Sequence, residues 1–324
     1  MKKRVLPHTD IQVSRLGLGT ATWGYGGDDE DAVAQLRAYA DAGGTLVETA
    51  NIYGGGESEK IIGRALSRYF RRDDFVIATK AGMVNGMPPS ADASKARMLS
   101  ELDASLRSLQ VDHVDLWLVH TWDSQVPVQE TLSAIDAAVA TGKVRAAGIC
   151  NYTGWQTARA VTIQELTGAT PISVTEVEYS LVQRGIDREV SRAAESLGIG
   201  VLPWAPLGRG VLTGKYLNGV PAEKHTSAFY QWYVRHYAED AELARIVAEV
   251  ADCAEELAVS PIQVSLAWVR DRPGVCAPLV GARTAGQLAE SLSSEALELP
   301  TEITDRLDKV SAPRLGYPER GLDR

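Results

Sequence analysis

The sequence predicts an α/β protein folded as a (β/α)8 TIM barrel, and three observations support this fold class. Segments with helical periodicity alternate with short apolar runs along most of the 324 residues. The runs are apolar almost throughout, as at 116–119 and 201–204, which is typical of parallel strands buried on both faces. No Gly/Pro-rich linker divides the chain, so we expect a single barrel domain over residues 1–324.

The elements follow one another in a regular order. A short β-hairpin is expected over residues 4–13, around the turn His8-Thr9-Asp10, and the first barrel strand within 15–20. The other strands are expected at 45–50, 75–80, 114–120, 144–150, 173–179, 200–205 and 275–281. The helices are expected at 30–42, 58–70, 94–110, 128–141, 154–166, 187–197 and 284–295.

Three segments depart from this alternation. A long loop is expected after strand seven, over residues 208–236, and an extra helix over 238–258. The C-terminal stretch 300–324 is expected to add a final helix and a polar, proline-containing end. These insertions enlarge the barrel without indicating a second domain.

Composition limits the classes of function. The chain is 45% hydrophobic with a net charge of −9, which argues against a nucleic-acid partner. Its three cysteines form no CxxC pair and no His/Cys cluster with metal-ligand spacing, so we expect no metal and a reducing compartment such as the cytoplasm. The basic N-terminus lacks the apolar region of a signal peptide, and no run of about 18 apolar residues predicts a membrane span.

Polar residues stand at the ends of three adjacent predicted strands. Glu48 ends strand two and Tyr53 follows it, Lys80 ends strand three, and His120 ends strand four. A parallel barrel brings all these ends to one rim. Each residue could be structural, the histidine as a satisfied hydrogen-bonding group and the lysine as half of an ion pair. Four such groups on one rim favour a functional site.

This set of side chains suits proton donation to a carbonyl oxygen. A free tyrosine has a pKa of about 10 and is a weak acid at neutral pH. An adjacent ammonium such as Lys80 lowers that pKa, Glu48 can hold the ammonium, and His120 can donate a hydrogen bond or orient the reacting group. Because the set holds no nucleophile, the electron pair must come from a bound hydride donor.

At this point the chain resembles the aldo-keto reductase superfamily over nearly its whole length. It is similar in particular to the branch of bacterial general reductases and voltage-gated potassium channel β subunits. The resemblance lies in ordered motifs: ETANIYGGGESEKIIGRAL, VIATK, DLWLVH, GICNY, EVEYSL, WAPLGRGVLTGKY and VGARTAGQLAES.

The resemblance implies a role for each matching position. Tyr53 becomes the general acid, assisted by Lys80, His120 and Glu48, and the cofactor becomes NADP(H). Asn151 and Glu176 would bind the nicotinamide carboxamide, and Trp204 would stack on the ring. The implied cofactor-binding residues are completed by Gly19, Thr20, Pro206, Leu207, Gly208, Gly210, Lys215, Gly281, Arg283, Gln287 and Glu290. Leu207, Gly208, Gly210 and Lys215 would line the pyrophosphate, Arg283 and Gln287 the 2′-phosphate, and Glu290 the adenine. Trp23, Tyr25 and Trp122 would wall the substrate pocket, although each suits ordinary rim packing as well.

The chain also departs from the family pattern. Glu48 replaces an aspartate, Glu176 a glutamine and Cys150 a serine, and His225 falls where the branch often has an arginine. A misplacement of about 1 Å beside the catalytic lysine can cost on the order of a hundredfold in rate. The charge of Glu176 would favour the oxidised, positively charged nicotinamide.

Three functions fit these observations. The first is an NADPH-dependent reductase that converts an aldehyde or ketone to an alcohol. The second is a cofactor-binding regulatory protein with slow or vestigial turnover, similar to the channel β subunits. The third, a Schiff-base lyase with Lys80 as nucleophile, leaves Tyr53 and the 204–210 loop without a use. The expected partner is a small carbonyl compound, and neither nucleic acid nor membrane.

Overall fold

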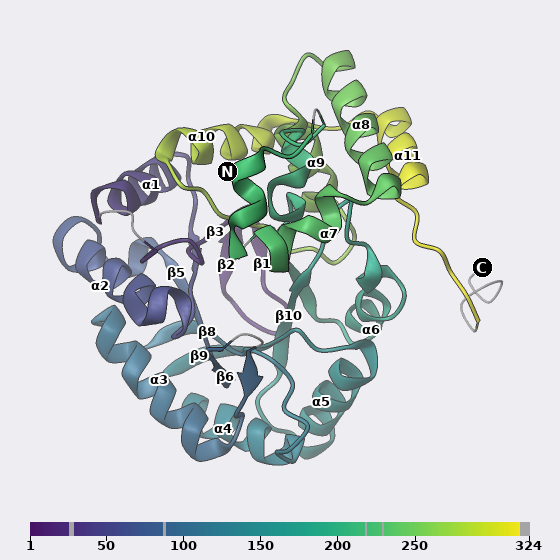
Figure 1. Cartoon of the computed structure of the whole chain (residues 1–324). Helices are drawn as coiled ribbons and strands as arrows, with labels where there is room; N and C mark the ends of the chain where they lie inside the picture. Colours follow the sequence, from purple (N-terminus) through teal and green to yellow (C-terminus); the bar gives the residue numbers. More distant parts are fainter. Residues whose placement is uncertain (26–28, 87–88, 218, 229, 318–324) are drawn as a thin grey trace.

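The computed structural model describes residues 1–25, 29–86, 89–217, 219–228 and 230–317. Across these residues, eight parallel strands form one sheet in the order β11-β10-β9-β8-β5-β4-β3-β12 (Figure 1). The strands are β3 (Gly17–Gly19), β4 (Leu46–Glu48), β5 (Val76–Ala81), β8 (Val114–Val119), β9 (Val144–Cys150), β10 (Ile172–Glu178), β11 (Gly200–Trp204) and β12 (Leu279–Val280). A parallel bridge connects Val201 of β11 with Val275, which lies just before β12, so the sheet forms the predicted, nearly closed barrel.

Helices surround this barrel in Figure 1. The predicted positions are confirmed, with small shifts at the ends. The ring consists of α1 (Asp29–Asp41), α2 (Glu57–Tyr69), α3 (Lys95–Leu109), α4 (Val128–Ala140), α5 (Gly154–Thr167), α6 (Val190–Ser196), α9 (Pro261–Arg270) and α10 (Ala285–Ser293). The predicted helix at 187–197 is divided into the short turn η3 (Gly185–Asp187) and α6.

Helix α9 is absent from the sequence-based prediction. All residues from Val264 to Arg270 are buried, so the segment shows no alternation between an apolar and a polar face. Its start does carry a readable signal, because Ser260 and Gln263 form a capping box around Pro261 at the first helical turn. That capping signal could have identified the helix.

The eighth strand is shorter than predicted. The prediction covered 275–281, but β12 pairs with β3 only at Leu279 and Val280. Pro278 has no backbone N–H to donate and interrupts the ladder. Before it, the Cys276 N–H donates to the carbonyl of Val201 at 2.8 Å, on the other side of the closure.

The N-terminal hairpin is confirmed as β1 (Lys3–Val5) paired antiparallel with β2 (Gln12–Ser14). Its apolar side chains Leu6, Ile11 and Val13 are buried in the same cluster as Leu116 and Val174, which lie on barrel strands. The hairpin therefore covers one end of the barrel interior.

The extra segments lie where the sequence placed them. The loop after β11 contains η4 (Gly208–Thr213), η5 (Ala222–Thr226), η6 (Tyr230–Val234) and α7 (Arg235–Ala238). The extra helix is α8 (Ala241–Glu256), which starts after the capping side chain of Asp240, and the final helix is α11 (Thr301–Val310). Residues 318–324 of the predicted polar end lie outside the described residues.

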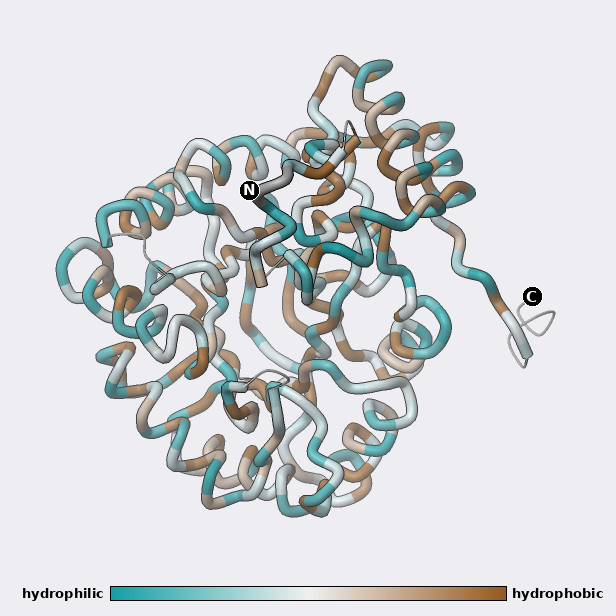
Figure 2. Tube along the Cα trace, viewed as in Figure 1, coloured by the Kyte–Doolittle hydropathy of each residue, from teal (hydrophilic) through white to brown (hydrophobic). Residues whose placement is uncertain are grey.

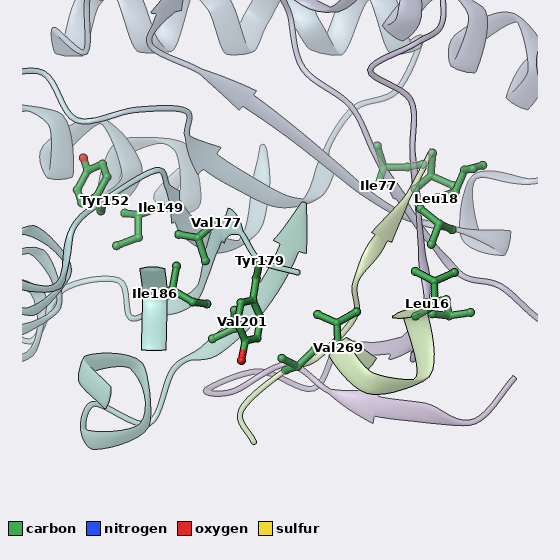
Figure 3. Packing of buried hydrophobic residues seen from close by; sticks show 14 of the residues in the cluster. Leu16, Leu18, Ile77, Ile149, Tyr152, Val177, Tyr179, Ile186, Val201 and Val269 are labelled. Carbon is green, nitrogen blue, oxygen red and sulfur yellow. The ribbon is translucent and has the colours of Figure 1, made fainter. Parts of the chain in front are cut away.

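Most of the core lies between the strands and the helical ring. Figure 2 shows hydrophobic colour along the central strands, while the surrounding helices carry both colours. Buried side chains such as Leu18, Ile77 and Val201 belong to one large cluster with Val269 of α9 (Figure 3). This packing fixes the strands, and thereby the rim at their carboxyl ends.

Candidate active site

Lys80, near the carboxyl end of β5, is the centre of a buried polar cluster. Its Nζ donates to the hydroxyl of Tyr53 at 3.1 Å and to the carbonyl of Thr49 at 3.2 Å. The same Nζ ion-pairs with Glu48 Oε1 and, at 3.2 Å, with Glu176 Oε1. An ammonium has three N–H bonds, so these four oxygen atoms compete for them. The structure thus brings Glu48, Tyr53 and Lys80 together, as expected, and adds Glu176.

Tyr53 reaches this cluster from the turn η1 (Tyr53–Gly56) that leads from β4 to α2. Its hydroxyl donates to Glu48 Oε1 at 3.0 Å. The following Gly54 has φ +58°, and a Cβ there would lie 2.6 Å from the carbonyl oxygen of Trp23. Only glycine fits this turn, and the turn directs the tyrosine ring back over the rim.

The pKa of Tyr53 is raised well above its ordinary value by burial, and next by the negative charge of Glu176. This direction is the opposite of the one expected from Lys80 alone. The sequence-based expectation counted the ammonium, but it did not include burial or the second carboxylate. In the free protein Tyr53 therefore keeps its proton.

His120 follows β8 and faces Tyr53 edge-on, with ring centroids 6.0 Å apart and ring planes at 82°. Burial, and then the charge of Lys80, lower the pKa of His120 well below its ordinary value. Its Nδ1 is buried and has no partner among the described residues. A neutral imidazole can donate one hydrogen bond to a carbonyl oxygen without carrying charge.

Glu176 lies in β10, and its side chain is almost completely buried. Besides Lys80, its Oε1 accepts a hydrogen bond from the Cys150 thiol at 3.7 Å. Its Oε2 is buried and has no partner among the described residues. Burial raises the pKa of Glu176, and the ion pair with Lys80 opposes that rise. Sequence reasoning placed Glu176 beside a nicotinamide but missed its contact with Lys80.

Asn151 and Trp204 lie next to each other at the ends of β9 and β11. The Trp204 indole N–H donates to Asn151 Oδ1 at 3.0 Å, and Asn151 Nδ2 donates to the carbonyl of His120 at 3.1 Å. Asn151 adopts φ +58°, in the left-handed region that asparagine tolerates better than most residues. These bonds fix the indole ring beside the polar cluster.

The 204–210 loop continues from β11 with several left-handed residues. Gly210 has φ +88°, and a Cβ at this position would lie 2.6 Å from the Nζ of Lys215. Arg209 donates to Glu178 at 3.0 and 3.1 Å, and its guanidinium lies 5.0 Å from the ring centroid of Trp204. Sequence reasoning missed Arg209, although its place inside the WAPLGRG motif was a signal.

Three cations, Lys215, Lys224 and Arg283, lie close enough to interact electrostatically. Burial, and then the charges of Arg283 and Lys224, lower the pKa of Lys215. Among the described residues, no carboxylate forms a salt bridge with any of the three. Arg283 precedes α10, whose cap Thr284 accepts from the N–H of Gln287 at 3.3 Å. Positive charge gathered beside a helix N-terminus, here Arg283 with Lys215 and Lys224 close to it, suits a phosphate group.

Comparison with known proteins agrees with this geometry. The Aldo/keto reductase family model matches residues 15–312. The chain belongs to the aldo/keto reductase family. Members of this family generally use a nicotinamide cofactor, and the chain is accordingly an oxidoreductase by family.

Three relatives of this aldo/keto reductase show how differently similar chains are described. "Aldo-keto reductase YhdN" of Bacillus subtilis (strain 168) is 33% identical over 90% of this chain and 88% of its own length. "Uncharacterized oxidoreductase YrpG" of the same strain is 30% identical over 96% of both chains. A "Probable voltage-gated potassium channel subunit beta" of Oryza sativa subsp. japonica is 29% identical over 99% of this chain and 98% of its own.

The remaining expected residues of this aldo/keto reductase fall into two groups. Some have their polar atoms engaged inside the protein: Thr20 Oγ1 donates to the carbonyl of Glu48 at 2.9 Å, and the Trp23 indole donates to Gln35 at 3.2 Å. Pro206 and Gly208 are buried in the loop, and Gly19 lies against Glu48. The others remain accessible: Tyr25, Gly281, Arg283, Gln287 and Glu290 are exposed, and Leu207 and Trp122 are half-buried. Their individual roles stay predictions.

Two features are absent from the part of the chain that the structure describes. No group of three or more His, Cys, Asp and Glu side chains that could hold a metal ion occurs among them. Within the same residues, no helix is long and apolar enough to cross a membrane.

Proposed function

We propose that this chain is an NADP(H)-dependent oxidoreductase that reduces an aldehyde or ketone to an alcohol, with Tyr53 as the general acid. The observation that carries the proposal is the Tyr53 hydroxyl held at 3.1 Å by Lys80, with a neutral His120 facing it. Within the same proposal, residues 1–324 act as one barrel domain. Three free, buried cysteines fit a reducing compartment, and we propose the cytoplasm.

His120, Tyr53 and Lys80 have different roles in the proposed reduction. A bound nicotinamide supplies the hydride, and the protein supplies the proton. His120 donates to the substrate oxygen, which places the carbonyl against the Tyr53 hydroxyl. As negative charge develops on that oxygen, its basicity rises until it takes the Tyr53 proton. The Lys80 ammonium then stabilises the tyrosinate, which compensates for the raised pKa of Tyr53.

The cofactor-binding part of the proposal uses the features at the ends of the 204–215 segment. Trp204 offers a flat face for the nicotinamide, and Asn151 holds its indole in place. Lys215 and Arg283 supply positive charge for phosphate groups. The observations that fit a phosphorylated dinucleotide are these cations, which form no salt bridge among the described residues, and the buried atoms of His120 and Glu176 that have no partner in the same part of the chain.

Turnover assays test the proposed function directly. The purified protein is mixed with NADPH and a panel of aliphatic and aromatic aldehydes and ketones, and absorbance at the NADPH band is followed. We expect turnover on several aldehydes, because the proton donor and the cation site are both formed. No turnover on any carbonyl or alcohol, together with cofactor binding, would favour the second candidate.

That second candidate is a cofactor-binding regulatory protein with slow turnover. One observation favours it: burial, and next the charge of Glu176, raise the pKa of Tyr53 and so weaken the acid. The relative described as a potassium channel β subunit is consistent with it.

The cation site leads to a prediction about cofactor choice. Arg283→Ala is expected to weaken NADPH binding by about ten- to a hundredfold, because a hydrogen bond to a charged group contributes roughly 1.5–3 kcal/mol. NADH, which lacks the 2′-phosphate, should lose much less. Kd values for both cofactors, measured from the quenching of tryptophan fluorescence, check this. Arg107→Ala, at an exposed site on α3, is the control. Equal wild-type affinity for the two cofactors would contradict the assignment.

A further inference from the structure

The buried cluster contains more negative than positive charge. Among the residues that the structure describes, Lys80 is the one cation paired with Glu48 and Glu176, and both carboxylates contact its Nζ. All three side chains are at most 4% exposed. An uncompensated charge at such a depth is costly, so the cluster must either bind a proton or face an outside cation.

Glu176 is the member that can hold this proton. Its Oε2 is buried without a partner among the described residues, so a proton on that atom breaks no existing bond. The titratable groups that face it are Lys80 from β5, Cys150 from β9 and Tyr53 from η1. Glu48 faces it across Lys80, and the residue paired with it on β11 is the apolar Leu202. Burial acts in the same direction, because it raises the pKa of Glu176.

The proposed reaction places a variable charge near this carboxyl group. Reacting atoms must approach to about 3–3.5 Å, and the carbonyl oxygen must reach the Tyr53 hydroxyl at the same time. A nicotinamide that reduces this carbonyl would therefore be bound near Tyr53, whose hydroxyl shares Lys80 with Glu176. The ring is neutral when reduced and positively charged when oxidised. At an effective dielectric of about 20, unit charges about 8 Å apart alter an affinity by about 30-fold.

We propose that Glu176 is a charge-compensating residue that carries a proton when the nicotinamide is reduced and loses it when the nicotinamide is oxidised. This inference rests on the proposed function. Binding of the oxidised cofactor converts the carboxylic acid of Glu176 into a carboxylate, and the proton passes to solvent. Binding of the reduced cofactor leaves the acid protonated. The site therefore holds NADP⁺ more tightly as pH rises, which favours alcohol oxidation under alkaline conditions.

The test uses equilibrium binding and needs no turnover. Kd values for NADP⁺ and NADPH are measured from pH 5.5 to 9 by the quenching of tryptophan fluorescence. Because both cofactors carry the same 2′-phosphate, its ionisation cancels in the ratio of the two Kd values. In the wild type we expect the affinity for NADP⁺ relative to NADPH to rise by up to about tenfold per pH unit until a plateau is reached. In Glu176→Gln the ratio should be independent of pH.

Two controls make the result specific. Glu59→Gln removes another buried carboxylate, on α2, whose pKa is also raised by burial, and it should keep the wild-type slope. Calorimetry of the wild type in buffers of different ionisation enthalpy should show more proton release for NADP⁺ than for NADPH. A flat wild-type ratio, an unchanged slope in Glu176→Gln or equal proton release would overturn the inference. If neither cofactor binds, the proposed function itself fails.

Discussion

Tyr53→Phe is expected to lower kcat by about 100- to 10,000-fold, the usual contribution of a positioned general acid. The variant keeps the ring and its edge-on contact with His120 but loses the hydroxyl that donates to Glu48. Lys80 keeps its bonds to Thr49, Glu48 and Glu176, so the rim and the cofactor site should persist. We therefore expect a nearly unchanged cofactor Kd.

The measurement combines steady-state kinetics on one good aldehyde with a cofactor titration. Tyr69→Phe is a matched control, because Tyr69 is an exposed tyrosine at the end of α2, 51% exposed and outside the site. Wild-type turnover in Tyr53→Phe would eliminate the proposed mechanism. Loss of cofactor binding together with kcat would point to a structural role for the hydroxyl.

Lys80→Met is expected to cost about 3–5 kcal/mol in the free energy of unfolding at pH 8, because it leaves buried carboxylates without their cation. The loss in the free energy of unfolding should become smaller toward pH 5. Burial already raises the pKa of Glu176 above the value of about 4.3 for an unfolded chain, and removal of Lys80 raises it further. A group with a raised pKa gives full stability below its unfolded pKa, and that stability is lost as pH rises through the folded pKa.

Urea unfolding at pH 5 and pH 8 measures this difference. Lys143→Met is the control, because Lys143 forms an ion pair with Asp103 at 2.6 Å with both side chains at least 40% exposed. An exposed pair of this kind contributes about 0–1 kcal/mol and should show little dependence on pH in this range. Equal destabilisation by Lys80→Met at both pH values would contradict this prediction, because it would mean that the buried carboxylates do not titrate between pH 5 and pH 8 in the variant.

Much of the fold could be predicted from the chain. Short apolar runs such as 116–119 are typical of parallel strands buried on both faces, and their regular alternation with helices predicted the barrel. The helix starts expected at residues 154 and 284 agree with α5 and α10, which begin at Gly154 and Ala285 directly after the N-cap residues Thr153 and Thr284. Helix α9 was missed, because a segment buried along most of its length loses the polar face that marks an amphipathic helix.

The sequence by itself determined which strand ends carry Glu48, Tyr53, Lys80 and His120, because strand direction alone brings such residues to one rim. Only the tertiary structure decided that Glu176 also reaches Lys80 across the barrel, at 3.2 Å. That contact depends on the register of β10 against β9 and on the closure of the sheet, neither of which is encoded locally. The tertiary structure also decided that the pKa of Tyr53 is raised rather than lowered, because burial and a second carboxylate act only once the chain is folded.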